Sequence, residues 1–305
     1  MEHTEYTMLT DQFAGHLFVP RNRYRDIGIV VLTGGEREWL SPRSVAERFA
    51  ECGLVSLSVS LYGARDQQRW ISEIPLEMVE RAVEVLIRKG CEQIGVYGYS
   101  IGAIIAVLAA QRIPRITRLV LVSPLHVNLG GLTDKWKKAT GKSLATWRGK
   151  EIPYLELDCG RGSLKRYVYD QEAGRRVMRC WQACRDAYKD SQLEEAGMLR
   201  LDQTCARILL VYSMTDEQWD ADYAAHRLVK TLLDHDFDRE FKNLCFPEAS
   251  HLLGVMPSRE RNRKLFRWMP LLHGREFRNL RRDPKGCFMD MEQSEQVIIQ
   301  WLQNR

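Results

Sequence analysis

Short, continuously apolar runs alternate with helical stretches along most of the chain, and this alternation limits the possible folds more than any other feature. Gly28–Leu32 is such a run and ends in Thr33-Gly34-Gly35, as expected for a central parallel strand that is covered on both faces. Residues 75–89 have apolar residues at helical spacing, with Pro75 at the start and Gly90 beyond the end. Such alternation predicts an α/β fold with a mostly parallel central sheet and helices on both of its faces.

The other predicted elements continue this alternation. An N-terminal hairpin is expected at the sheet edge, and Arg- and Trp-rich residues 255–290 show no clear element after about residue 270. Strands are predicted at 28–32, 54–61, 94–98, 118–123, 206–212 and 241–246, and helices at 42–52, 75–89, 101–111, 220–234 and 292–302.

One long stretch breaks the pattern. Residues 125–200 are polar and glycine-containing and then helical in character, so they are predicted to form an insertion that acts as a cap or lid. A length of 305 residues suits one large domain, and we expect a single domain over 1–305 that carries this insertion.

Composition excludes several classes of protein. Hydrophobic residues make up 45% and charged residues 28%, which is ordinary for a globular protein and excludes global disorder, collagen and coiled coil. No apolar run approaches the length of a membrane span. A net charge of +5 is too small to argue for nucleic acid, although it would suit an anionic substrate.

Cysteine usage and the N-terminus bear on location. The eight cysteines form no C-x-x-C pair, so we expect reduced thiols, no metal site and no cofactor. The N-terminus is polar and lacks the apolar region of a secretory signal. Together these features favour a cytoplasmic protein, whose oligomeric state the sequence leaves open.

The sequence G-x-S-x-G stands at Gly98-Tyr99-Ser100-Ile101-Gly102. It follows a predicted strand and opens a predicted helix, and a tight turn in that context presents the serine hydroxyl above the sheet. Ser100 is therefore the predicted nucleophile. An ordinary glycine-rich turn is the alternative.

A serine needs a base to activate it and an acid to orient that base. His251 lies in a loop after the last predicted strand, and Asp216 lies just past the strand before it. Glu217 is adjacent and could replace Asp216, while His126 could line the pocket. The order Ser100, Asp216, His251 is that of α/β hydrolases. Two backbone N–H groups should hold the oxyanion, one from Ile101 and one from the Gly34-Gly35 loop.

Two further groups of residues remain open to more than one interpretation. A basic cluster could dock phosphates, although a solvated face is the favoured interpretation, and aromatic residues of the insertion could line an acyl channel or form a small core. The basic residues are Arg259, Arg261, Arg263, Lys264, Arg267, Arg275, Arg278, Arg281 and Arg282, and the aromatic ones are Trp136, Trp147, Tyr154 and Trp181.

Several stretches together resemble the C-terminal catalytic domain of the type I acyl-CoA thioesterase and bile acid-CoA:amino acid N-acyltransferase family. The segments Asp216-Glu-Gln-Trp219 and Cys245-Phe-Pro-Glu-Ala-Ser-His251 are more specific than G-x-S-x-G. The resemblance also includes 13–20, 73–83, 98–102 and 127–131.

The resemblance implies an α/β-hydrolase fold and attack on an acyl-CoA thioester, with a triad that maps onto Ser100, Asp216 and His251. A thioester of a carrier protein is the alternative that a second, looser resemblance adds. The amidating transferases of the family use cysteine as nucleophile, whereas serine stands at position 100. A serine ester is less readily captured by an amine than a thioester is, so hydrolysis is expected over acyl transfer. The insertion and residues 249–254 resemble, more loosely, the bacterial acyl-ACP thioesterase of bioluminescence.

Other functions stay open at this point. A carboxylesterase or lipase-like enzyme would have the same triad and a different pocket. Acyl transfer to an amine or a carrier is a further alternative. A peptidase would need a peptide-binding domain that the sequence does not show, and a binding module would normally lack one member of the triad.

Overall fold

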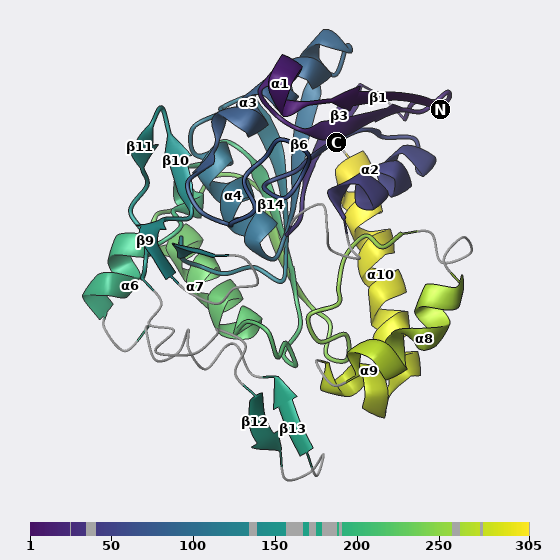
Figure 1. Ribbon diagram of the computed structural model, residues 1–305, viewed down its shortest axis with the longest axis vertical. Coiled ribbons are helices and arrows are strands. Elements are labelled where there is room, and N and C mark those ends of the chain that lie inside the picture. Colours follow the sequence, from purple (N-terminus) through teal and green to yellow (C-terminus); the bar gives the residue numbers. More distant parts are fainter. Residues whose placement is uncertain are drawn as a thin grey trace.

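The computed structural model gives the arrangement of most of the chain (Figure 1). The residues it describes are 1–24, 26–34, 41–133, 139–156, 167–170, 175–178, 188, 191–257, 263–274 and 277–304.

A mostly parallel sheet of eight strands forms the centre of the molecule, as predicted. Its strands are β1 (Glu2–Tyr6), β2 (Gly15–Val19), β3 (Ile27–Leu32), β4 (Val55–Val59), β6 (Gln93–Tyr99), β7 (Ile116–Val122), β14 (Arg207–Tyr212) and β15 (Phe241–Cys245). They lie in the order β1-β2-β4-β3-β6-β7-β14-β15. All neighbours from β4 to β15 pair in parallel, whereas β1 and β2 form the predicted antiparallel hairpin at the edge.

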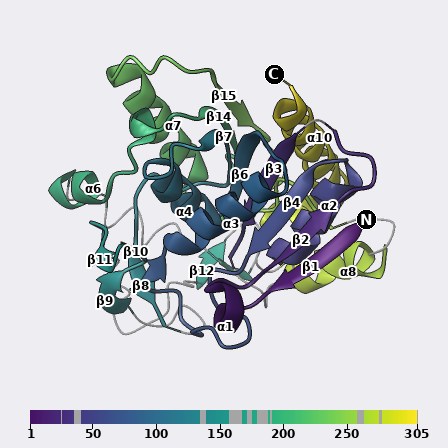
Figure 2. The same ribbon diagram turned by 90° about the horizontal axis from the view of Figure 1, so that it is seen from above.

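Helices cover both faces of this sheet (Figure 2). One face carries α3 (Glu77–Arg88), α4 (Ile101–Ala110) and α7 (Ala221–Asp234), and the other carries α2 (Pro42–Glu51) and α10 (Pro284–Gln303). Successive residues of a strand point to opposite faces. In β3, Val30 and Leu32 therefore pack with the first group of helices, while Ile29 and Val31 pack with the second. Burial on both faces explains why this strand is apolar throughout.

The chain leaves the sheet between β7 and β14. The described part of this segment contains several short strands and, near its end, one helix. Most of the stretch that the sequence suggests to be helical lies outside the described residues. Its elements are β8 (Gly130–Leu132), β9 (Ala139–Ser143), β10 (Ala145–Trp147), β11 (Lys150–Glu151), β12 (Tyr167–Asp170), β13 (Arg175–Met178) and α6 (Ser191–Gly197), followed by a 3₁₀ turn at Leu201–Gln203. β10 pairs in parallel with β5 (Ile74–Pro75), just before α3, which ties this segment to the main body.

The C-terminal part is more helical than predicted. Residues 263–273 form α8 (Arg263–His273), and α9 (Arg278–Arg282) follows where no element was expected. α10 begins at Pro284 rather than near residue 292, because the side chain of Asp283 accepts a hydrogen bond from the backbone N–H of Gly286 and caps the helix. A short α1 (Met8–Asp11) joins β1 to β2.

Five cysteines lie in the described residues, and all five are free thiols. They are Cys52, Cys91, Cys205, Cys245 and Cys287. None of the helices in the described part of the chain has both the length and the apolar character needed to cross a bilayer.

Candidate active site

Ser100 lies in the turn between β6 and α4. Its backbone has φ 57° and ψ −121°, a conformation that residues with a side chain rarely adopt and that is typical of a serine held at a sharp strand-to-helix turn. Two glycines make the turn possible. A Cβ atom at Gly102 would collide with the backbone carbonyl oxygen of Leu32, and one at Gly98 would lie 2.7 Å from the backbone of Ala103. The turn can therefore pack directly against β3 and α4.

Asp216 and His251 reach Ser100 from the loops that follow β14 and β15. His251 Nε2 lies 3.2 Å from Ser100 Oγ, and His251 Nδ1 lies 2.7 Å from Asp216 Oδ2. The three side chains thus form one continuous chain of hydrogen bonds. All three residues are buried, with 5% of Ser100, 7% of Asp216 and 3% of His251 exposed. Low exposure strengthens such polar contacts, because little water competes for them.

The loop that carries His251 is held from several sides. The backbone carbonyl of His251 accepts hydrogen bonds from the Tyr99 hydroxyl at 3.0 Å and the Ser123 hydroxyl at 3.2 Å. The ring of Phe277 stacks on the imidazole, with ring centres 6.3 Å apart and planes 12° apart. These contacts fix both the backbone and the ring plane of His251.

Glu217, the alternative acid, binds groups on both sides of the His251 loop. Its carboxylate accepts hydrogen bonds from the Ser250 hydroxyl and, at 2.9 Å, from the backbone N–H of Arg278. Glu217 therefore ties the His251 loop to the start of α9, while Asp216 is the carboxylate in contact with the histidine.

Trp219 is a member of the site that sequence reasoning did not assign. Its indole Nε1–H donates a hydrogen bond to Ser100 Oγ at 2.9 Å, and its side chain is fully buried. The backbone N–H groups of Gln218 and Trp219 also donate to Asp216 Oδ1, at 2.8 and 3.0 Å. The Asp-x-x-Trp spacing was the available signal, since a carboxylate that binds the N–H groups two and three residues ahead folds the fourth residue back toward it.

The predicted oxyanion loop is described only in part. Gly34 follows β3 and is buried, whereas Gly35 lies outside the described residues. Ile101 is the first residue of α4, so its backbone N–H has no partner within the helix. The neighbouring Thr33 hydroxyl is buried and has no hydrogen-bond partner in the part of the chain that the structure describes.

His126 is buried and belongs to a second polar cluster. Its Nε2 is 2.8 Å from Glu194 Oε1, and this oxygen also accepts hydrogen bonds from the Tyr223 hydroxyl and from Arg227 Nε. Burial lowers the pKa of His126 to about 4, so the ring is neutral and carries its hydrogen on Nε2. The other ring nitrogen, Nδ1, has no hydrogen-bond partner among the described residues. Rather than contacting Ser100, this histidine anchors α6 to α7.

The remaining sequence candidates are spread over the surface or fall outside the described residues. In the basic cluster, Lys264, Arg267, Arg281 and Arg282 are exposed and Arg278 is half-buried, while Arg259, Arg261, Arg275 and the side chain of Arg263 are not described. Trp147 and Tyr154 are half-buried, and Trp136 and Trp181 lie outside the described residues.

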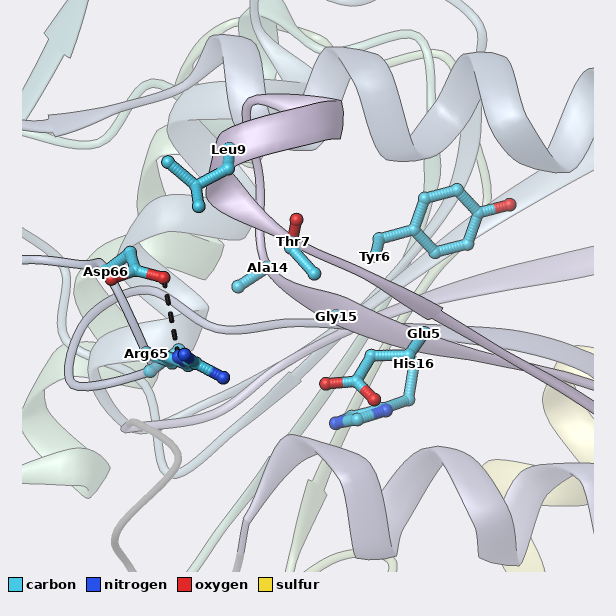
Figure 3. Close-up of a pocket in the computed structure, with 10 residues that line it drawn as sticks. Glu5, Tyr6, Thr7, Leu9, Ala14, Gly15, His16, Arg65 and Asp66 are labelled. Carbon is cyan, nitrogen blue, oxygen red and sulfur yellow. Dashed lines mark ion pairs between the residues drawn. The ribbon is translucent and has the colours of Figure 1, made fainter.

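A cavity of about 460 Å³ lies apart from Ser100, between the N-terminal hairpin and the loop that follows β4 (Figure 3). Arg65 and Asp66, whose charged groups are 3.7 Å apart, lie across it from Glu5 and His16. Ser100, Asp216 and His251 do not line it. In the part of the chain that the structure describes, no group of three or more His, Cys, Asp or Glu side chains is placed to hold a metal ion.

Comparison with known protein families shows to which family the chain belongs. The family model for the BAAT / acyl-CoA thioester hydrolase C-terminal domain matches residues 74–279, which is more than half of the chain. The chain belongs to this family. The match runs from just before α3 to the start of α9 and includes Ser100, Asp216, Trp219 and His251. No curated protein sequence matches the chain.

The eight-stranded sheet with helices on both faces confirms the α/β-hydrolase fold predicted from the sequence, and a superposition on a solved structure supports it. A sugar hydrolase from Lactococcus lactis superposes with a TM-score of 0.51 at 13% identity, over 82% of this chain and 84% of that one. A carboxylesterase from Lactobacillus plantarum has a TM-score of 0.46 at 12% identity, over 80% and 83% of the two chains. The esterase domain of a Rhodothermus marinus protein has a TM-score of 0.44 at 11% identity, over 82% and 88%.

Proposed function

We propose that this member of the BAAT / acyl-CoA thioester hydrolase family is a serine hydrolase that cleaves acyl thioesters of coenzyme A or of a carrier protein. The observation that carries the proposal is the hydrogen-bond chain from Ser100 Oγ through His251 to Asp216, with distances of 3.2 and 2.7 Å. Family membership supports the choice of a thioester as the bond that is cleaved.

In the first half of the reaction, Ser100 Oγ attacks the acyl carbonyl carbon while His251 Nε2 takes the hydroxyl proton. Asp216 accepts the hydrogen on Nδ1 and stabilises the imidazolium that forms. The carbon–sulfur bond then breaks, and His251 returns the proton to the departing sulfur. The backbone N–H of Ile101 and the Gly34-Gly35 loop are proposed to hold the negative oxygen.

In the second half, water attacks the serine ester. His251 takes a proton from the water, the bond between the acyl carbon and Ser100 Oγ breaks, and the proton passes to the serine. The acid is released and the enzyme is regenerated. Hydrolysis is proposed rather than conjugation to an amine, because the nucleophile is a serine. Residues 125–200 are proposed to form the cap of the single domain and to cover the acyl group.

The decisive experiment compares leaving groups. Thiol release is measured from acyl-CoAs of increasing chain length, beside nitrophenyl esters of matching length. We expect preference for the CoA thioesters and a fall of about 10⁴-fold or more in Ser100→Ala, since removal of a triad nucleophile has effects of this size. A fluorophosphonate probe should label the unsubstituted protein and not Ser100→Ala.

The control is Ser56→Ala, which removes another buried serine hydroxyl, one that donates to the backbone of α2 far along the chain from the triad. This variant should keep the label and the activity. Full activity in Ser100→Ala would refute the triad. Activity on simple esters alone would instead assign the protein as a carboxylesterase that shares the fold.

A further inference from the structure

The oxygen atom of Ser100 accepts a hydrogen bond that the triad does not supply. Trp219 Nε1 lies 2.9 Å from Ser100 Oγ, closer than His251 Nε2 at 3.2 Å. An indole N–H can only donate. The serine hydroxyl hydrogen is therefore left to point toward His251 Nε2, which is the direction that transfer of the proton to the base requires.

The short turn of residues 216–219 contains the acid and contacts both the base and the nucleophile. Asp216 Oδ1 accepts hydrogen bonds from the backbone of Gln218 and Trp219, and this leaves Oδ2 for His251. The Trp219 indole then contacts both remaining members: it donates to Ser100, and its ring lies edge-on to the imidazole with centres 6.4 Å apart. Backbone and side chain of a single residue thus orient the two ends of the hydrogen-bond chain.

We propose that Trp219 is a catalytic residue, which stabilises the negative charge that develops on Ser100 Oγ each time this atom gains or loses the acyl group. The proposal rests on the proposed function of Ser100 as nucleophile and adds a donor to it.

The hydrogen bond from Trp219 Nε1 to Ser100 Oγ is expected to be strongest in two steps of the reaction. During attack, the Oγ–H proton moves to His251 Nε2 while the bond from Oγ to the acyl carbon forms. During deacylation, that bond breaks and the proton returns from Nε2 to Oγ. In both steps the oxygen carries partial negative charge, and hydrogen bonds to charged oxygen are about twice as strong as those to neutral oxygen. The ester oxygen of the acyl-enzyme is a weak acceptor, so the N–H group favours the transition states over the intermediate.

The test separates the N–H group from the size of the ring. Trp219 is replaced by benzothienylalanine, in which sulfur takes the place of the indole N–H at nearly the same volume, and in a second variant by phenylalanine. Acylation and deacylation rate constants are measured separately with a nitrophenyl ester, per active site titrated with the fluorophosphonate. Both rate constants should fall about tenfold in both variants, the size expected for one hydrogen bond to a developing charge. KM should stay close to its original value.

The chain offers a matched control. Trp301 is also buried and packs on the opposite face of the sheet, and its Nε1 forms no hydrogen bond with any described residue. Trp301→Phe should lower stability by as much as Trp219→Phe does while leaving both rate constants unchanged. Loss of stability alone would affect both variants in the same way.

The outcomes distinguish the two proposals. If Ser100 is labelled and the benzothienylalanine variant keeps both rate constants, Trp219 is only a core residue and this inference is wrong while the triad stands. If the same variant loses acylation but not deacylation, the donor does not act on the departing oxygen, which also overturns the inference. If the unsubstituted protein is not labelled at Ser100, both proposals fall together.

Discussion

At the scale of single residues, the position of Ser100 depends on atoms that are missing from its neighbours. Gly102 has no Cβ, and the space where one would stand is occupied by the carbonyl oxygen of Leu32 in β3. Backbone cannot move aside as a side-chain tip can, because the parallel hydrogen bonds of β3 hold it on both sides. The turn and the strand are consequently one rigid unit.

Gly102→Ala should therefore lower the free energy of unfolding by about 3 kcal/mol, at the upper end for overpacking a core. The control is Gly95→Ala, near the start of β6, the strand that leads into the turn, where the new methyl group would meet the flexible end of Ile29 at 2.8 Å. We expect a smaller loss there, measured by urea denaturation. Equal midpoints for the two variants would show that β3 yields as easily as a side chain does.

The sequence predicts the three residues of the hydrogen-bond chain but not the fourth contact. Ser100, Asp216 and His251 can be selected because each follows a strand, and parallel strands bring their carboxyl ends to one edge of the sheet. The contact of Trp219 with Ser100 depends on how the turn after Asp216 folds, and a buried tryptophan is most often a core residue. Only the atomic arrangement distinguishes the two.

At the scale of elements, α10 shows how a single cap sets the length of a helix. Asp283 stands outside the helix, accepts the Gly286 N–H at 3.0 Å and is followed by Pro284 at the first helical position. Proline suits that position because its missing N–H would have no partner there. The cap adds two turns to a helix whose regular apolar spacing is visible only nearer its end.

Replacing Asp283 by alanine should lower the free energy of unfolding by about 1 kcal/mol, the usual effect of removing such a cap. Asp283→Asn keeps an oxygen that can accept the same hydrogen bond and should stay near the original stability. Thermal unfolding followed by circular dichroism measures both. A loss of the same size in the two variants would assign the effect to charge rather than to capping.

The elements that were predicted well and those that were not differ in where their partners lie. β3 and α3 follow from their own residues, since an apolar run and an amphipathic period are local patterns. β10 is three residues long and depends on pairing with β5, which is far away in the chain. α8 contains Pro270 within it, which interrupts the usual helical signal. Patterns of this kind cannot be recognised without the partners that stabilise them.

For the molecule as a whole, histidines that folding removes wholly or partly from water make the fold sensitive to acid. Burial holds the pKa of His126 at about 4, well below its value of 6.5 in an unfolded chain. His16, in the N-terminal hairpin, also has a pKa of about 4, chiefly because of burial. Between pH 6.5 and 4 the unfolded chain binds protons that the folded protein does not, so the free energy of unfolding falls as pH falls through this window and levels off below it.

His126→Gln should flatten this dependence. Glutamine can still donate to Glu194 but does not titrate. Between pH 6.5 and 4, the free energy of unfolding of this variant should therefore fall by about 3 kcal/mol less than that of the unsubstituted protein, given a pKa shift of this size. Urea denaturation at a series of pH values gives the comparison. His226→Gln, at an exposed histidine on α7, should keep the original slope. An unchanged slope in His126→Gln would mean that other groups cause the acid sensitivity.

The separation of the site residues along the chain has a consequence for following how the protein folds. Ser100 and His251 are 151 residues apart, and their contact requires that β14 and β15 have already joined the sheet. Helices such as α3 depend on local contacts and can form early, before long-range pairing is complete. If Ser100 reacts only in that finished arrangement, the amount of fluorophosphonate label measures how many molecules have folded completely. Its labelling during refolding, set against the earlier rise of helical signal, would time the closure of the far half of the sheet.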